Sequence, residues 1–198
     1  MKYRKLALFD FDGTITKEDT FIEFIKFAKG EVRFITGFGL LAPILILMKL
    51  KLYPNWRAKE RVMSFFFSGT SKLEFDTLCA EFASERVPGY VRSSALQKLH
   101  FHKERGDLVI IITASFENWL AAWAKPVCDL LLGTKLEIKN NTVTGKIEGK
   151  NCYGEEKVNR LRNALDLSEF NEIHAYGDSR GDKEMLTFST HPNFKVFK

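Results

Sequence analysis

Residues 5–14, KLALFDFDGT, join a short apolar run to two aspartates, a glycine and a threonine. The run Lys5–Phe9 is typical of a buried strand, and Gly13 marks the turn that ends it. Because one residue separates Asp10 from Asp12, alternation places both carboxylates on the same side of the chain. Two carboxylates this close repel unless a cation lies between them, and Mg²⁺ prefers such oxygen ligands. The stretch therefore predicts a buried strand that ends in an acidic metal site.

Strand and helix patterns alternate in the second half of the chain. Residues 108–112, LVIII, form a continuous apolar, mostly β-branched run typical of a central parallel strand. Further strands are predicted at 127–132, 172–176 and 194–197, a hairpin at 136–147, and helices at 116–124, 155–165 and 183–188. Strands separated by helices predict an α/β fold with a Rossmann-like, doubly wound parallel sheet. Ligands bind beyond the carboxyl ends of the strands in such sheets.

The segment 17–89 has a helical period instead, and either Asp19 or Thr20 would cap its first helix. We therefore expect an all-helical cap of residues 17–89, inserted into a core of residues 1–16 and 90–198. The uncharged run 34–48 falls short of the roughly 20 residues that span a bilayer. It predicts either a buried cap helix or a segment that lies on a membrane.

A hydroxyl and a lysine follow other predicted strands. Thr113 ends the strand at 108–112, and Ala114 with Ser115 opens the next predicted helix, so free amides would face an anion there. Thr113 alternatively only caps that helix. Lys157, near the start of a helix, can neutralise a phosphoryl oxygen. A lysine on the solvent face of that helix would give the same pattern, and Lys150 lies nearby.

A second pair of acids follows the strand at 172–176. Asp178 and Asp182 are four residues apart, so both approach one face of an opening helical turn. Asp182 alternatively orients or caps that helix. In such a set one carboxylate can attack phosphorus while a second protonates the leaving oxygen and later activates water. Mg²⁺ and a lysine would offset the charge on the phosphoryl group.

These motifs resemble those of the haloacid dehalogenase superfamily of phosphatases. The matching residues run in order from end to end of the core: Asp10–Thr14 (DFDGT), Thr113, Lys157 and 177–182 (GDSRGD). The resemblance implies Asp10 as nucleophile and Asp12 as general acid and base, with the Asp12 backbone carbonyl also at the metal. It further implies Thr113, Ala114 and Lys157 at the phosphoryl group, Asp178 as another Mg²⁺ ligand and Asp182 as an acid that orients the metal site.

The insert resembles the helical cap of the subfamily that contains phosphoserine phosphatase, and within it the phosphatidylglycerophosphatase C-like proteins. The similar features are Asp19, the apolar run 40–46, the basic pair Arg57 and Arg61, and Ser68-Gly69. The resemblance implies substrate contacts for Asp19, Arg57 and Arg61, although the two arginines fit a solvated surface equally well.

The favoured substrate is a membrane-lipid head-group phosphate such as phosphatidylglycerophosphate. The alternative is a small soluble phosphomonoester such as phosphoserine. Phosphoserine phosphatases carry Gly-Gly after the hydroxyl of the second motif, where this chain has Ala114-Ser115.

The amino-acid composition limits the classes of molecule that the protein is expected to bind. The 198 residues hold 30 Lys and Arg against 25 Asp and Glu, and a net charge of +5 fits anionic metabolites or membranes but is too small to indicate nucleic acid. Three scattered cysteines and a short apolar run after the basic start predict a reduced, cytoplasmic protein. The apolar run 34–48 and the resemblance to a lipid phosphatase add the expectation of a peripheral position at the inner face of the membrane.

Two other classes remain open. A signalling receiver domain also has an acidic Mg²⁺ site, a hydroxyl and a lysine, but Asp12 and the long insert argue against it. A non-catalytic scaffold on a membrane surface is disfavoured by the complete set of motifs.

Overall fold

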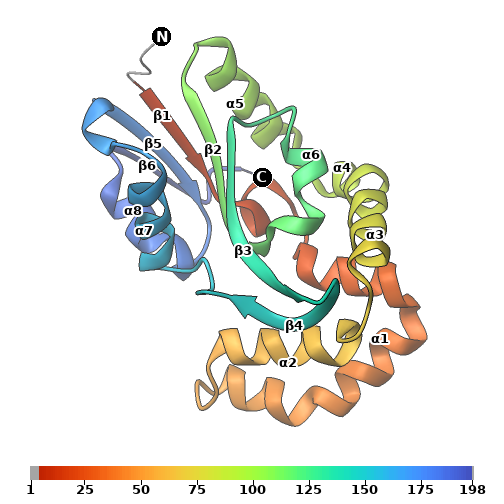
Figure 1. The fold of residues 1–198 in the computed structure, drawn as a ribbon. Helices are drawn as coiled ribbons and strands as arrows, with labels where there is room; N and C mark the ends of the chain where they lie inside the picture. The colour runs from red at the N-terminus through yellow and green to blue at the C-terminus, as the bar shows by residue number, and fades with distance from the viewer. Residues whose placement is uncertain (1–4, 198) are drawn as a thin grey trace.

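The computed structural model describes residues 5–197, with a six-stranded sheet at its centre (Figure 1). The strand order is β4-β3-β2-β1-β5-β6, and all neighbours are parallel except β3 and β4. The strands are β1 (Lys5–Phe9), β2 (Leu108–Phe116), β3 (Leu130–Lys139), β4 (Thr142–Glu148), β5 (Glu172–Gly177) and β6 (His191–Phe194). The predicted α/β fold with a doubly wound sheet is confirmed.

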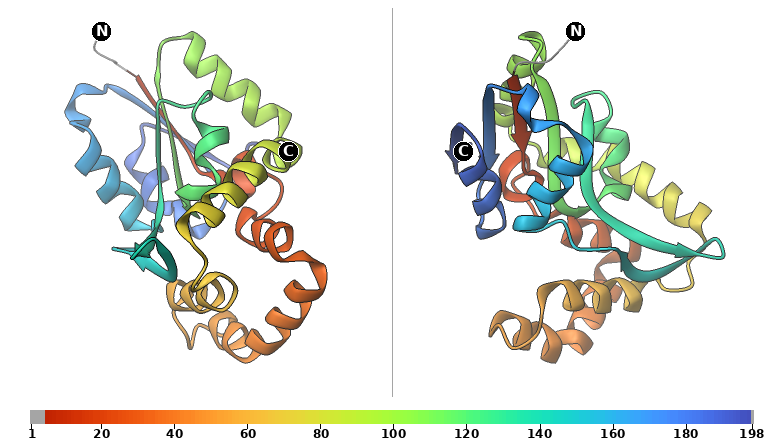
Figure 2. Two further views of the ribbon diagram at one scale, coloured as in Figure 1. Left: turned by 45° about the vertical axis from the view of Figure 1, so that its right-hand side comes forward. Right: turned by 60° about the vertical axis from the view of Figure 1, so that its left-hand side comes forward.

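Helices cover both faces of the sheet (Figure 2). Side chains alternate along a strand, so neighbouring residues of β1 face opposite sides of the sheet. Phe9 belongs to the hydrophobic cluster on one face, which includes Phe82 and Leu99. Leu8 belongs to the cluster on the other face, which includes Leu161. The first face carries α3 (Lys72–Glu85), α4 (Val87–Tyr90), α5 (Ser93–Glu104) and α6 (Ala121–Ala124), and the second carries α7 (Glu155–Ala164) and α8 (Lys183–Phe188).

Two further helices, α1 (Thr20–Lys49) and α2 (Asn55–Phe67), lie beyond the carboxyl end of the sheet, at the bottom of Figure 1. The Asp19 carboxylate accepts hydrogen bonds from the amides of Phe21 (3.0 Å) and Ile22 (3.4 Å), so it caps α1 as expected. At the other side of the helical segment, the amide of Lys17 donates to the carbonyl of Tyr90 at 2.9 Å. The two ends of the segment therefore meet beside the sheet.

Helix α1 incorporates the apolar run 34–48 and bends at Gly30, which has a φ of 75°. By length and composition α1 is able to cross a membrane, since its most apolar 18-residue window has a mean hydropathy of 1.7. Only 6% of that window is buried. The run alone understates the length of the helix, because helical residues continue on both sides of it.

Several predicted boundaries are wrong in detail. Strand β2 continues to Phe116, so the predicted helix at 116–124 shrinks to a 3₁₀ turn and the four residues of α6. Strand β3 begins at Leu130 rather than 127. The last strand is β6 rather than 194–197, and its Pro192 suits an edge strand because proline lacks the N–H for a second partner. The predicted hairpin turn is confirmed at Asn140 and Asn141, both with positive φ.

Candidate active site

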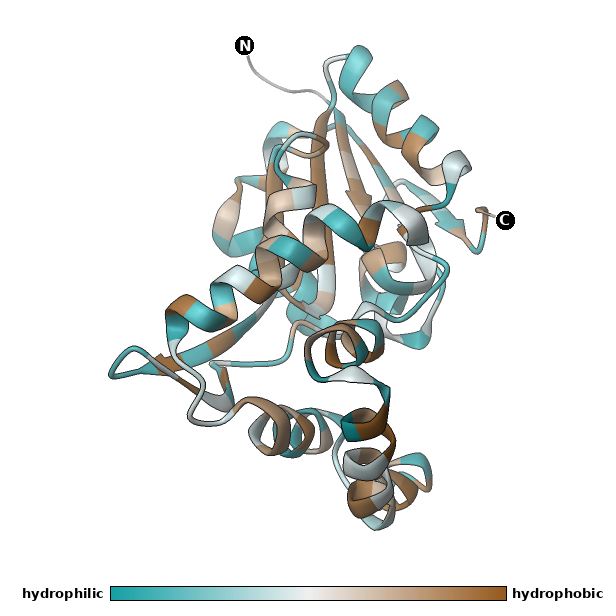
Figure 3. Cartoon of the chain, turned by 90° about the vertical axis from the view of Figure 1, so that its right-hand side faces the viewer, coloured by the Kyte–Doolittle hydropathy of each residue, from teal (hydrophilic) through white to brown (hydrophobic). Residues whose placement is uncertain are grey.

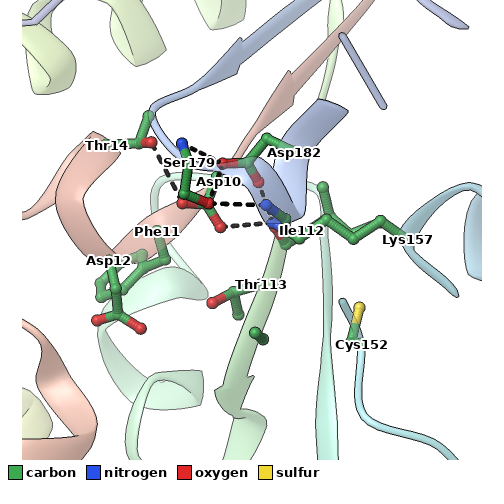
Figure 4. Close-up of polar contacts among 12 residues, drawn as sticks. Asp10, Phe11, Asp12, Thr14, Ile112, Thr113, Cys152, Lys157, Ser179 and Asp182 are labelled. Atoms are coloured by element: carbon green, nitrogen blue, oxygen red, sulfur yellow. Dashed lines mark hydrogen bonds and ion pairs between the residues drawn. The ribbon is translucent and has the colours of Figure 1, made fainter. Parts of the chain in front are cut away.

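Lys157 joins two acids at the carboxyl ends of β1 and β5 (Figure 4). The first turn of α7 places its ammonium between Asp10 and Asp182, where Nζ donates to Asp10 Oδ1 at 2.5 Å and to Asp182 Oδ1 at 2.6 Å. A third bond runs to the carbonyl of Ile112 at 3.0 Å, at the carboxyl side of β2. Lys150, the other lysine considered, is exposed.

Burial and charge oppose each other in this trio. Burial raises the pKa of Asp10 to about 7 even though Lys157 lowers it. Burial also disfavours the Lys157 ammonium, but Asp10 and Asp182 outweigh burial and raise the pKa of Lys157 above its usual value. For Asp182, burial is outweighed by Lys157 and by bonds from Ser179, so its pKa is lowered. One cation thus holds two buried acids together.

The second carboxylate oxygen of Asp182 accepts hydrogen bonds from the turn after β5. Asp182 Oδ2 accepts from the amides of Asp178 (3.2 Å) and Ser179 (3.0 Å) and from Ser179 Oγ (2.9 Å). A Cβ at Gly177 would lie 2.5 Å from the Cβ of Asp182, so only glycine fits there. Both oxygens of Asp182 are therefore committed within the protein, which suits an orienting role.

The donors for a metal ion gather beside this turn. Carboxylate oxygens of Asp10, Asp178 and Asp182 all lie within 4.8 Å of one another. Thr14 Oγ1 approaches Asp10 Oδ2 at 3.2 Å and Asp178 Oδ1 at 3.4 Å, and a Cβ on Gly13 would lie 2.5 Å from Asp178 Oδ2. Burial raises the pKa of Asp178. Hard oxygen donors of this kind fit Mg²⁺, and Asp10 and Asp178 are the acids that would hold it.

The Asp12 carboxylate does not share this site, contrary to the expectation that Asp10 and Asp12 flank one cation. Its Oδ1 accepts from the amide (2.8 Å) and hydroxyl (2.6 Å) of Thr20, and its Oδ2 accepts from Ser115 Oγ. The strand ends at Phe9 and residues 11–15 form a tight turn with Gly13 at a φ of 81°, so strand alternation no longer applies. Burial raises the pKa of Asp12.

The backbone at Thr113 differs from the prediction. No helix opens at Ala114, because β2 continues with a bulge between Ile112 and Phe116. The Ser115 amide donates to Thr113 Oγ1 at 3.0 Å, and the Ala114 carbonyl accepts from the side chains of other elements. The bulge, rather than a helix N-terminus, therefore directs Thr113 towards the site.

A cavity of about 310 Å³ opens above these groups, within the size range of small-molecule sites. The charged and polar residues Asp10, Asp12, Thr113, Lys157 and Asp182 form its base, together with Ala114. Its other wall comes from the helical segment and is mostly apolar, with Phe21, Ile22, Phe38, Leu45, Met48 and Val62, joined by Asp19 and Lys59.

The cation that α2 contributes to this cavity is Lys59, which was not among the expected residues. Its Nζ donates to the Ala114 carbonyl at 2.7 Å and to Asn151 Oδ1 at 3.3 Å. Burial lowers the pKa of Lys59 to about 8. Arg57 and Arg61 are exposed and line a separate hollow, so the expectation that they line the substrate cavity does not match the structure.

Helical phase explains this difference. Residues two apart on a helix point to different sides, whereas residues three or four apart share one. Lys59 shares its side of α2 with the buried Val62 and Met63. The apolar face of α2 was therefore the signal in the sequence that pointed to Lys59 rather than to the arginines.

Comparison with known proteins agrees with this geometry. A family model described as haloacid dehalogenase-like hydrolase matches residues 7–187. The protein CicA of Caulobacter vibrioides is 31% identical over 197 residues, which cover 98% of this chain and 86% of CicA.

Solved structures share the fold. A protein of unknown function from Bordetella pertussis Tohama I is 25% identical with a TM-score of 0.83, over 95% of this chain and 88% of that one. A phosphoserine phosphatase solved as a phospho-aspartyl intermediate analogue is 20% identical with a TM-score of 0.60, over 94% of this chain and 83% of that one. With the family model covering most of the chain, the protein belongs to the haloacid dehalogenase-like hydrolases.

Proposed function

We propose that this hydrolase is a Mg²⁺-dependent phosphatase that acts through a phospho-Asp10 intermediate, with α1 and α2 of the helical segment 17–89 as a cap over the site. The observation that carries the proposal is the separation of two acids with different partners. Asp10 lies against the Lys157 ammonium at 2.5 Å, whereas Asp12 is held by Thr20 and Ser115. One acid can therefore serve as nucleophile and the other as proton donor.

The two acids divide the reaction into two steps. In the first, an oxygen of Asp10 forms a bond to phosphorus, the bond to the leaving oxygen breaks, and Asp12 gives that oxygen its proton. The raised pKa of Asp12, caused by burial, favours the protonated form needed here. In the second step Asp12 removes a proton from water, which attacks the phosphorus and releases phosphate from Asp10.

Lys157 and Thr113 would bind the phosphoryl oxygens, where an ammonium and a hydroxyl offset the charge that builds in the transition state. Mg²⁺ held by Asp10 and Asp178, with the Asp12 backbone carbonyl, would supply further positive charge to the phosphoryl group. Asp182 keeps Lys157 in place through their 2.6 Å contact.

For the substrate, the proposal favours the phosphate of a membrane-lipid head group, of the phosphatidylglycerophosphate kind. The apolar wall of the cavity includes Leu45 and Met48 of α1, and the same helix exposes large apolar residues to the outside. Figure 3 shows hydrophobic residues in brown on the helices beyond the sheet. The exposed apolar residues on α1, in the turn after it and at the start of α2 are Val32, Ile35, Leu40, Ile46, Leu47, Leu50, Leu52 and Trp56.

Exposed cations border this apolar surface, including Arg33, Lys49 and Lys51. Apolar side chains flanked by lysine and arginine are the composition of helices that lie in the interface of an anionic membrane. The proposal therefore places the protein at the cytoplasmic face of the membrane, where the head group of one lipid enters the cavity beside α1.

A small soluble ester such as phosphoserine is the second candidate. Its support is Asp19, which lines the cavity and would pair with a substrate amine, together with the fold shared with phosphoserine phosphatase.

Phosphate release from a panel of substrates tests the proposal. We expect release from phosphatidylglycerophosphate in mixed micelles to exceed release from phosphoserine, and a chelator to abolish both until Mg²⁺ is restored. A preference for phosphoserine would transfer the proposal to the soluble ester. No release from any phosphomonoester would refute the phosphatase assignment.

The apolar surface is tested by Leu40→Asp, with Leu73→Asp as matched control. Leu40 is 72% exposed on α1 and Leu73 is 79% exposed on α3, so neither change should disturb the core. Because burying a leucine contributes about 1.5 to 3 kcal/mol, Leu40→Asp should weaken cosedimentation with anionic vesicles by roughly 10-fold or more. Equal binding of Leu40→Asp and Leu73→Asp to the vesicles would refute the proposal that this apolar surface contacts the membrane.

Lys59 predicts a pH dependence of KM. Burial lowers its pKa to about 8, so the ammonium is present below this pH and is lost as the pH rises through it. An anionic head group should then bind less tightly, and KM should rise above about pH 8. In Lys59→Met, loss of a charged hydrogen bond should raise KM about 10- to 100-fold at pH 7 and remove that rise. An unchanged pH profile in Lys59→Met would exclude Lys59 as its source.

A further inference from the structure

Two histidines and a glutamate gather at the amino end of β5, opposite the acids at its carboxyl end. Glu172 opens β5, His174 follows two residues later, and His191 opens β6. Side chains two apart on a strand share a face, and β5 and β6 pair in parallel with His174 opposite His191. The two strands thus bring three potential metal ligands to one face of the sheet.

The distances suit a shared ion. The nearest ligand atoms of Glu172, His174 and His191 all lie within 4.8 Å of one another. His174 Nε2 is 2.7 Å from Glu172 Oε1, and the two imidazole rings lie 4.5 Å apart between centroids. Zinc bonds to imidazole nitrogen and carboxylate oxygen are about 2.0 to 2.2 Å long. Side-chain rotations, without movement of the strands, would bring the three ligands around one ion.

A neighbouring threonine prepares His191 for binding. Thr190 Oγ1 donates to the Ile173 carbonyl at 3.1 Å and accepts from the Ile173 amide at 2.7 Å. With its one proton used, the hydroxyl accepts from His191 Nδ1, which lies 2.9 Å away. His191 Nδ1 then carries the proton of the neutral ring, and the lone pair of Nε2 is available to a metal. A bond of this kind to the second ring nitrogen is the usual support of a ligating histidine.

Glu172 supplies the negative charge. Lys5 Nζ lies 2.6 Å from Oε2, while Oε1 faces His174 and lies 3.9 Å from Arg105. Lys5 and Arg105 would repel a metal ion, so we expect weaker binding than at a zinc site without neighbouring cations.

We propose that Glu172, His174 and His191 form a second metal site, for a divalent transition metal of the zinc class, that fastens β6 to β5. Two imidazoles and one carboxylate suit zinc and its neighbours, whereas Mg²⁺ prefers oxygen ligands alone. The ion would replace the Nε2 proton of His174, which passes to the solvent.

Binding of a metal ion at this site would stabilise the C-terminal end of the chain. β6 has four residues and lies at the edge of the sheet. In the residues after β6, the Lys195 amide donates a hydrogen bond to the Gly177 carbonyl at 2.9 Å. The Phe197 ring stacks on the Tyr176 ring, with 5.3 Å between their centroids. An ion that binds the paired strands but not the unfolded chain stabilises this arrangement by mass action.

Calorimetric titration of untagged, chelator-treated protein with ZnCl₂, in excess Mg²⁺, tests the proposal. We expect one zinc equivalent in the wild type, its loss in His191→Gln, and its retention in His100→Gln, a matched change of an exposed histidine on α5. Zinc should also raise the Tm of the wild type and of His100→Gln but not of His191→Gln.

The variant Asp178→Asn separates this site from the acids at the other end of the sheet. Zinc binding that survives in Asp178→Asn and disappears in His191→Gln supports the proposal. Zinc binding that is equal in the wild type and His191→Gln, or absent up to millimolar zinc, overturns it. None of these outcomes depends on phosphatase activity.

Discussion

Replacing Asp10 with asparagine is expected to lower kcat by roughly 10⁴-fold or more, the scale found when an enzyme loses its nucleophile. An amide cannot form the acyl phosphate, although it keeps the size of the carboxylate. The buried side chain contacts Lys157 at 2.5 Å, and Lys157 keeps its bond to Asp182 in the variant. Phosphate release by wild type and Asp10→Asn on the same substrate measures the effect.

The fold should survive this change. Burial raises the pKa of Asp10 to about 7, so its ionised form is costly in the folded protein and a neutral amide removes that cost. Circular dichroism and the Tm should therefore match the wild type. The control is Asp76→Asn, which removes a carboxylate on α3 that pairs with Lys72 at the surface. Full turnover in Asp10→Asn would refute the nucleophile assignment.

The elements that hold the site follow closely from local sequence. The apolar run before Asp10 and the β-branched run before Thr113 identify two neighbouring strands, and parallel strands bring their carboxyl ends to one edge. The same argument brings in Asp178 after β5. The prediction of these positions needed no knowledge of distant contacts, because hydrophobic pattern and turn residues determine where each strand ends.

The side-chain directions needed information that local sequence does not hold. Asp12 turns towards Thr20 and Ser115, and Ser115 lies 103 residues further along the chain. Lys59 reaches the carbonyl of Ala114, 55 residues away, and a bulge in β2 replaces the predicted helix start. These features depend on packing between elements, which periodicity does not report.

The length of α1 is another feature that the local pattern of apolar residues did not predict. The apolar run 34–48 by itself falls short of the length that spans a bilayer, but the helical backbone continues through the charged residues around it for the 30 residues of α1. Its apolar outer face and the cavity wall lie on one helix. In the proposed function this continuity links substrate selection to attachment at the membrane.

Replacing Lys157 with methionine is expected to lower the free energy of unfolding by about 3 to 5 kcal/mol at pH 7, the scale for removing one partner of a buried ion pair. The side chains of Lys157, Asp10 and Asp182 are 2%, 9% and 0% exposed. Without the ammonium, two buried carboxylates face each other. Urea unfolding of Lys157→Met and of the exposed control Lys150→Met measures the difference, and activity should fall with it.

The sign of the pH dependence gives a further check. In the wild type Lys157 holds the pKa of Asp182 below its usual value, so this stabilisation is present near pH 7 and is lost as the pH falls through that lowered pKa. In Lys157→Met the acids gain stability by taking up protons, so the deficit should shrink as the pH falls from 7 towards 4. A deficit that stays constant over this range, or equal unfolding midpoints for both variants, would contradict an ionic role for Lys157. A constant deficit would mean that Lys157 contributes by packing its alkyl chain rather than by its charge.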